Sequence, residues 1–157
     1  LRPEQVGIIV HPQSIVHSLV QFRDGSMKAQ LGLPDMKLPI LYALSYPKRL
    51  PTDWPRFDFA KYPSLTFEEP DMASFRNLAL ALQAMDRGGN APCVLNAANE
   101  VAVRLFLEGR IGFLAMSDLI EERLAKATFV QHPTLEDLEA TDAESRREAL
   151  KGGTVNV

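Results

Sequence analysis

The 157-residue chain has one cysteine, no surplus of basic residues and no long apolar run. Because Cys93 is the single cysteine, it cannot form an internal disulfide, so we expect a reducing, cytoplasmic location. Cys93 has no cationic neighbour in the sequence, so we expect it to be a small core residue rather than a nucleophile. Lysine and arginine number 17 against 20 aspartate and glutamate residues, which leaves no excess charge to bind nucleic acid. The apolar runs fall far short of the ~20 residues that span a bilayer, so we expect no membrane partner.

Motifs for several common sites are also missing. No Gly-rich loop of the dinucleotide- or phosphate-binding type occurs, because the glycine pair Gly88-Gly89 stands at a predicted helix end. His11 and His17 are six residues apart, but Pro12 interrupts the strand between them and no third ligand follows at a recognisable spacing. The sequence therefore predicts no metal site formed by this chain alone.

The first third of the chain predicts β structure. A short apolar run over residues 6–10 has the length of a strand, and residues 15–22 alternate in the manner of a second strand. Asp24-Gly25 is a strong turn signal, and residues 27–31 would return antiparallel to form a hairpin.

A short helix and a long connection follow. Asp35 can cap the backbone of a helix that Pro47 then stops, and Pro39 is tolerable there because it falls in the first turn. Residues 51–70 are rich in proline and aromatic residues without a clear period, which predicts a packed connection with one short strand at 65–67.

From residue 71 the apolar spacing is helical. The pattern predicts four helices, the first closed by Gly88, the third capped by Ser117 and the last opened by a capping box of Thr141 and Glu144. The predicted fold class is therefore α+β, an antiparallel β-hairpin followed by a C-terminal helical bundle, with the best domain boundary between residues 1–70 and 71–157.

Three polar residues interrupt the second of these helices. Asn96, Asn99 and Glu100 are spaced i, i+3, i+4 and share one face. They either satisfy a neighbouring helix or loop, or support the wall of an active site; the spacing allows both.

Three segments resemble the 1-deoxy-D-xylulose 5-phosphate reductoisomerase family. They are residues 11–18 (HPQSIVHS) running into 22–26 (FRDGS), residues 29–40 (AQLGLPDMKLPI) and residues 95–102 (LNAANEVA). The similarity extends over nearly the whole chain, and the motifs are too long and varied to match by chance.

The resemblance implies an enzyme of the methylerythritol phosphate route to isoprenoids. Such an enzyme rearranges 1-deoxy-D-xylulose 5-phosphate, a phosphorylated sugar, and reduces the product with NADPH to 2-C-methyl-D-erythritol 4-phosphate, using Mg²⁺ or Mn²⁺. It is a homodimer with a Rossmann-type domain, a central catalytic domain and a C-terminal helical domain. Residues 1–70 would be the end of the catalytic domain and 71–157 the helical domain; the Rossmann glycines, the acidic metal ligands and the phosphate-binding run would lie upstream.

The resemblance also implies four site residues. His17 matches the family's active-site histidine, near the substrate in a supporting role. Pro34, Asp35 and Met36 match the loop whose proline and methionine pack on the nicotinamide, where an apolar wall excludes water from hydride transfer. Asp35 is expected to cap the helix rather than touch the chemistry. For Met36 the alternative is a core residue at the helix start. In the family the sheet of the catalytic domain contributes to the dimer contact, and an exposed strand edge can pair with a partner, so the resemblance implies a homodimer through the β segment.

Two functional hypotheses follow. In the first, the chain is the C-terminal part of such a reductoisomerase, and it is inactive alone because metal, phosphate clamp and cofactor domain are not held together. The presence of His17, Pro34 and Met36 favours this hypothesis, and a start at Leu1 rather than at methionine is consistent with it. The alternative is a stand-alone, non-catalytic binding or dimerisation module with the same fold.

Overall fold

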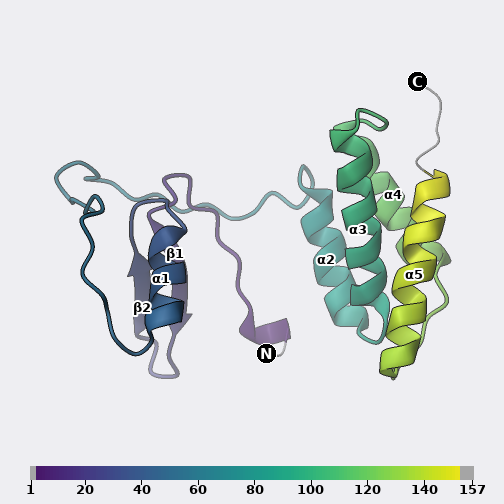
Figure 1. The fold of residues 1–157 in the computed structure, drawn as a ribbon, viewed down its shortest axis with the longest axis horizontal. Helices are drawn as coiled ribbons and strands as arrows, with labels where there is room; N and C mark the ends of the chain where they lie inside the picture. The colour runs from purple at the N-terminus through teal and green to yellow at the C-terminus, as the bar shows by residue number, and fades with distance from the viewer. Residues whose placement is uncertain (1–2, 153–157) are drawn as a thin grey trace. The chain divides into compact units, whose positions relative to one another are not determined.

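A computed structural model describes residues 3–152 of the chain. Among these, residues 7–70 form one compact unit, and residues 71–152 together with 3–6 form another. The first unit contains a two-stranded antiparallel sheet and one α-helix, and the second contains four α-helices and a short 3₁₀ helix, Pro3–Gln5 (Figure 1). The predicted α+β fold, a hairpin followed by a helical bundle, is confirmed. None of the helices in residues 3–152 is both long and apolar enough to cross a membrane.

The hairpin consists of β1 (Val16–Gln21) and β2 (Met27–Leu31), close to the predicted strands. Gly25 adopts the left-handed conformation, with φ of 86°, that the turn requires and that glycine takes without strain. The Asp24 carboxylate accepts hydrogen bonds from the backbone and the hydroxyl of Ser26 and so closes the turn. The local sequence therefore determines this turn.

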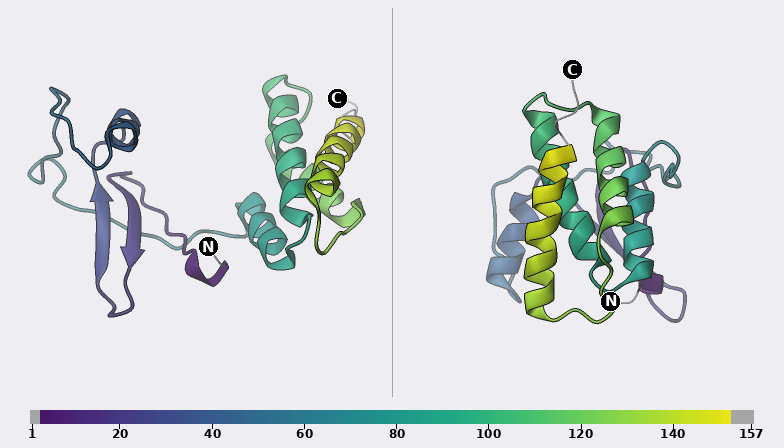
Figure 2. Two further views of the ribbon diagram at one scale, coloured as in Figure 1. Left: turned by 60° about the horizontal axis from the view of Figure 1, so that its bottom comes forward. Right: turned by 90° about the vertical axis from the view of Figure 1, so that its right-hand side faces the viewer.

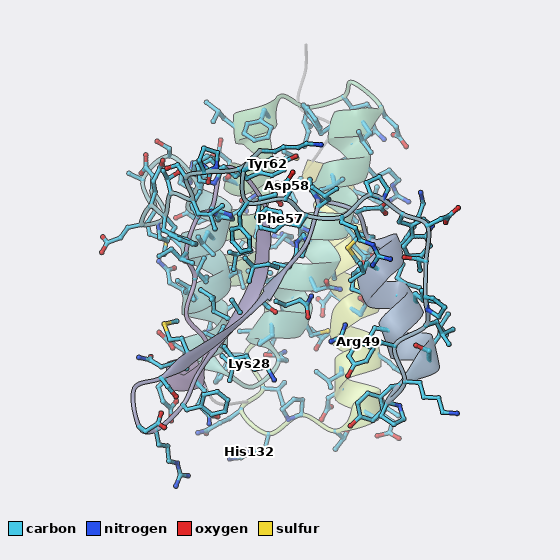
Figure 3. All side chains as sticks on the ribbon, turned by 90° about the vertical axis from the view of Figure 1, so that its left-hand side faces the viewer. Lys28, Arg49, Phe57, Asp58, Tyr62 and His132 are labelled. Carbon is cyan, nitrogen blue, oxygen red and sulfur yellow. The ribbon has the colours of Figure 1, made fainter. Side chains whose placement is uncertain are left out.

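Helix α1 (Lys37–Ser45) follows the hairpin directly. The Asp35 carboxylate accepts a hydrogen bond from the Lys37 backbone N–H at 2.9 Å, as predicted for a capping residue. No residue of α1 is buried, and Leu44 is 83% exposed. In the connection that follows, the ring of Phe57 stacks on that of Tyr62, with centroids 5.5 Å apart (Figure 3).

Two predicted strands are wrong. Residues 6–10 are exposed and form no strand; only Val10 pairs, in an isolated antiparallel bridge with Glu68. The strand expected at 65–67 is absent as well, and that segment is held by the same bridge and by side-chain contacts instead. An apolar run of strand length becomes a strand only where a partner offers a ladder of hydrogen bonds.

The second unit is a bundle of four helices that lie side by side (Figure 2): α2 (Arg76–Arg87), α3 (Ala91–Leu107), α4 (Phe113–Lys126) and α5 (Leu135–Gly152). Helix α3 contacts the other three, and its many small residues allow close approach. Burial of a side chain such as Leu105 or Ile120 contributes about 1.5–3 kcal/mol. The core is formed by Leu80, Ala98, Val101, Ala102, Leu105, Met116, Leu119, Ile120 and Ala149.

Asn90 joins the turn between α2 and α3 to the segment that precedes α5. The side chain is buried, and its amide nitrogen donates to the Thr128 carbonyl at 2.9 Å and to the Thr141 hydroxyl at 3.2 Å. Its amide oxygen accepts from the Val130 backbone N–H at 3.0 Å. At the neighbouring Gly89, with φ of 56°, a Cβ would lie 2.3 Å from the Val130 carbonyl oxygen, so only glycine fits. A buried amide with these partners fixes where the two segments meet.

Both helix caps predicted in the last third are wrong. Helix α4 begins after Gly112, which leaves Ser117 inside the helix, and α5 begins after Thr134, which leaves Thr141 inside. The real capping box joins Thr134 and Asp137: the Thr134 hydroxyl accepts from the Asp137 N–H, and the Asp137 carboxylate accepts from the Thr134 N–H. The Thr141 hydroxyl instead accepts a hydrogen bond from the side-chain amide of the buried Asn90.

The two cap assignments can be separated by mutation. We expect Thr134→Ala to lower the free energy of unfolding by about 1 kcal/mol, because it leaves a helix N–H without its partner. Ser117→Ala is the matched control, and it should leave that free energy unchanged or slightly higher, since alanine suits a helix interior. Urea unfolding followed by circular dichroism measures both. An equal loss in the two variants would contradict the observed helix starts.

Candidate functional site

The hairpin brings the predicted site residues together. Val16 pairs with Leu31, and the next pair along the ladder is Ser18 with Gln30. His17 is therefore an extra residue in β1, the position of a β-bulge, which redirects a side chain and is common beside active sites. The bulge stands opposite the end of β2, where the chain enters residues 33–36.

Gly32 provides the space that the His17 ring occupies. Gly32 is buried, and its N–H donates to the Ile15 carbonyl at 3.0 Å, which extends the hairpin by one bond beyond Leu31. A Cβ built on Gly32 would lie 3.4 Å from His17 Nε2. The imidazole thus lies against the backbone just before the loop that contains Pro34 and Met36, and the structure places the predicted histidine beside the predicted loop.

The loop of residues 33–36 exposes Pro34 and Met36, and its one charged side chain, Asp35, is bound to the start of α1. Met36 is 69% exposed and Pro34 is exposed, so Met36 is not part of a core within residues 7–70. The hydrogen bond from the Lys37 N–H holds the pKa of the Asp35 carboxyl below its ordinary value, and Lys37 Nζ lies 3.5 Å from the same carboxylate. Asp35 therefore anchors the loop to α1, and Pro34 and Met36 supply the apolar part of its exposed surface.

The structure offers no support for a metal site in this region. In residues 3–152, no group of three or more histidine, cysteine, aspartate or glutamate residues lies together in a way that could hold an ion. The two histidines have separate surroundings: His11 Nδ1 lies 2.7 Å from the Thr66 carbonyl oxygen, whereas His17 lies against Gly32. Their even spacing in the sequence does not make them a ligand pair.

The polar residues on α3 hold helices together. Asn96 donates to the Glu100 carboxylate at 3.3 Å, and Glu100 accepts from Arg146 of α5 at 2.8 Å. Arg146 also binds Asp142, and its hydrogen bond lowers the pKa of the Glu100 carboxyl. Of the two interpretations of this face, contact with a neighbouring helix accounts for Glu100, and Asn96 supports that contact through its bond to Glu100.

The other candidates are far from catalytic geometry. The Cys93 thiol donates to the Leu138 carbonyl at 3.4 Å, and burial raises its pKa, which disfavours the reactive thiolate. His132 is exposed in the loop before α5 (Figure 3). Sequence reasoning missed the role of Gly32; the available signal was a glycine standing directly between a strand and a loop of interest.

The contact between His17 and Gly32 can be tested with two substitutions in the full chain. In Gly32→Ala the added methyl meets Nε2 at an ordinary contact distance, so the ring should stay in place. In Gly32→Val the two further methyls overlap the ring, so we expect the His17 imidazole signals in a ¹H–¹³C spectrum to shift well beyond those of the alanine variant. Equal spectra for the two variants would mean that the ring does not lie against Gly32.

The chain is similar to proteins of one family over almost its whole length. Residues 31–148 match the family described as DXP reductoisomerase C-terminal domain. A 1-deoxy-D-xylulose 5-phosphate reductoisomerase from Phocaeicola vulgatus is 57% identical over 150 residues, covering 96% of this chain and 39% of the relative. One from Bacteroides fragilis is 58% identical over 147 residues, covering 94% of this chain and 38% of the relative.

Solved structures agree in fold. The Zymomonas mobilis reductoisomerase in complex with NADPH superposes with a TM-score of 0.84 at 42% identity, covering 94% of this chain and 39% of that one. A DOX-P reductoisomerase in complex with NADPH, fosmidomycin and magnesium gives 0.89 at 36% identity, covering 98% of this chain and 40% of that one. The chain spans about two fifths of the length of these relatives. It belongs to the DXP reductoisomerase C-terminal domain family.

Proposed function

We propose that this chain supplies the C-terminal part of a cytoplasmic, NADPH-dependent enzyme that converts 1-deoxy-D-xylulose 5-phosphate into 2-C-methyl-D-erythritol 4-phosphate. The observation that carries the proposal is the placement of His17 against Gly32, directly before the exposed Pro34 and Met36. The relatives that bear the name of this enzyme support it. Residues 1–70 then belong to the catalytic domain and residues 71–157 form the C-terminal helical domain.

The loop of residues 33–36 fits one face of a nicotinamide ring. Pro34 is rigid and Met36 is adaptable, and both present apolar surface outward. Against a bound cofactor they would exclude water on one side and hold the ring at a fixed angle. NADPH supplies the hydride in this reaction, and the loop orients its ring.

His17 is the residue of this chain proposed to lie near the substrate. Its side chain is exposed and makes no hydrogen bond to any residue that the structure describes, so the ring is accessible to a ligand. A histidine in that position can donate or accept a hydrogen bond at a substrate oxygen and so orient it. We assign it an orienting role.

The divalent ion of the reaction has no ligand set among residues 3–152. We propose that Mg²⁺ or Mn²⁺ is bound by parts of the relatives' sequence that this chain does not cover. No step of the chemistry is therefore assigned to a metal ligand of this chain.

A chimera tests the function. In the Bacteroides fragilis relative, the matching 38% of the sequence is replaced by this chain, which is 58% identical there. We expect the chimera to oxidise NADPH only when 1-deoxy-D-xylulose 5-phosphate and Mn²⁺ are both present. The isolated chain should show no turnover, because catalysis needs the cofactor, metal and phosphate sites held in one geometry. Oxidation is followed by absorbance at the NADPH band.

Two variants of the chimera give the controls. His17→Ala should lower kcat about 100-fold or more, the usual range for loss of a positioned acid–base or orienting group. Leu107→Ala, on an exposed position of α3, should leave kcat unchanged. A folded chimera without activity would refute the proposed function and favour the non-catalytic module. Substantial turnover by the isolated chain would refute the prediction that this chain is inactive alone.

We also propose that the protein is a homodimer through the β segment. In the part of the chain described, the sheet has two strands and two open edges, and Val20, Phe22 and Met27 are each at least half exposed. Apolar side chains beside an unpaired edge are suited to pairing with a second copy.

Light scattering of the chimera tests the dimer. We expect twice the monomer mass at micromolar concentration, and Val20→Lys should shift the mass toward the monomer because it places a charge in the contact. Leu107→Lys, a similar change on the helical unit, should leave the mass unchanged. A monomer with the unchanged sequence, or a dimer that is insensitive to Val20→Lys, would contradict a contact through this segment.

A further inference from the structure

Residues 10–13 are tied to a segment more than fifty positions later. Gln13 makes two hydrogen bonds to Thr66: its amide nitrogen donates to the hydroxyl at 2.8 Å, and its amide oxygen accepts from the backbone N–H at 3.1 Å. Val10 and Glu68 exchange backbone hydrogen bonds at 2.9 Å in both directions. We call residues 10–13 and 66–68, with these contacts, the strand-entry clamp.

His11 adds a third contact to the strand-entry clamp, although one of its ring nitrogens is left buried without a hydrogen-bond partner among the described residues. Its Nδ1 lies 2.7 Å from the Thr66 carbonyl oxygen, and since a carbonyl only accepts, Nδ1 carries the proton and donates. The ring stacks on Phe67 with centroids 4.7 Å apart. Nε2 is buried and has no hydrogen-bond partner among the described residues, which is unfavourable for a polar atom. The hydrogen bond from Nδ1 to Thr66 is therefore present although it leaves the buried Nε2 without a hydrogen-bond partner among the described residues.

The clamp leads directly into β1. The Ser14 N–H donates to the His11 carbonyl at 3.0 Å, and Ser14 has φ of +52°, a left-handed conformation that is unfavourable for a residue other than glycine. The next residue, Ile15, is completely buried and accepts from the Gly32 N–H. Val16 follows, and then His17 at the bulge. The turn at residues 11–14 is thus connected to His17 through the strained Ser14, the fully buried Ile15 and Val16.

We infer that His11 and Gln13 are positioning residues for His17. By fixing the turn to residues 66–68, they set where Ile15 enters the hairpin, and Ile15 in turn sets where the His17 ring lies against Gly32. Neither residue is required to touch the substrate, because both act through the backbone of Ser14 and Ile15. This inference rests on the proposed function for its catalytic meaning.

The strained Ser14 explains why such a clamp is needed. A backbone held in a sparsely populated conformation returns to a more common one unless its neighbours hold it. Release of the turn would let Ile15 shift along β1, and the bulge, which lacks a ladder partner, would absorb the shift. The displacement would then appear at His17 rather than in the regular pairs that follow it.

Kinetics of the chimera test the inference through Gln13. We expect Gln13→Ala to lower kcat about 10-fold or more with little change in KM for NADPH, because displacement of a reacting group by about 1 Å costs on the order of 100-fold. Gln13→Glu keeps two acceptor oxygens for the Thr66 N–H and hydroxyl, so it should restore most of kcat. Gln83→Ala, the same deletion at an exposed position of α2, should leave kcat unchanged.

Two milder variants cover the case in which Gln13→Ala does not fold. Thr66→Val removes only the hydroxyl contact and should lower kcat several-fold. His11→Asn keeps a side-chain donor near the position of Nδ1 and should retain more kcat than His11→Leu. Melting temperatures are recorded with each kcat, so that activity is compared among enzymes folded at the assay temperature.

A second readout does not depend on catalysis. In the full chain, Gln13→Ala should shift the His17 imidazole signals in a ¹H–¹³C spectrum, whereas Gln83→Ala on α2 should not. If the unchanged chimera is inactive, the proposed function fails, and these spectra still decide whether the clamp positions His17. Gln13→Ala that lowers the melting temperature but leaves both kcat and the His17 signals unchanged would show a purely structural contact and overturn the inference.

Discussion

The antiparallel pairing of β1 with β2, with its single bulge at His17, is the constraint on which the candidate site depends. It brings the imidazole against Gly32, and thereby beside a loop that begins at the next residue. An isolated two-stranded hairpin is at best marginally stable in water. The geometry of the site must therefore be reinforced from outside the ladder, by the buried Ile15 and by contacts between residues 10–13 and 66–68.

The two units solve the problem of stability differently. The helical unit has a continuous core centred on α3, and the buried Asn90 fixes its loops with three hydrogen bonds. In residues 7–70, by contrast, Ile15 is the only large apolar side chain among those fully buried, while α1 exposes Leu44 and Ile40. A helix that is apolar on all sides suits burial in a larger protein. The unit that carries the candidate site is thus the one that depends more on neighbours.

The sequence predicted what is determined locally. The hairpin was predictable because Asp24-Gly25 encodes its own turn, and the end of α2 because Gly88 supplies the conformation that a helix end requires. The starts of α4 and α5 were not, since Ser117 and Thr141 also fit cap patterns, and tertiary contacts decide between them. At Thr141, the hydroxyl is already used by Asn90, fifty-one positions earlier.

The candidate site divides in the same way. Motifs pointed to His17, Pro34, Asp35 and Met36 individually, but a bulge is a property of two strands in register and leaves no signal in either strand alone. The same holds for Gly32. From the sequence it indicates only the end of a strand, and the structure adds that the His17 ring lies against it. Contacts between distant positions, such as Gln13 with Thr66, are equally invisible to periodicity.

The orientation of the 33–36 loop indicates what kind of ligand it suits. The Asp35 carboxylate accepts a hydrogen bond from the start of α1, and the apolar Pro34 and Met36 of the same loop are exposed. Exposed apolar surface is costly unless something covers it. A rigid proline and an adaptable methionine beside an exposed histidine are suited to a ligand with a flat apolar face and polar atoms nearby. A nicotinamide ring next to an oxygen-rich substrate combines both features, which is why the proposed function accounts for the whole loop rather than for His17 alone.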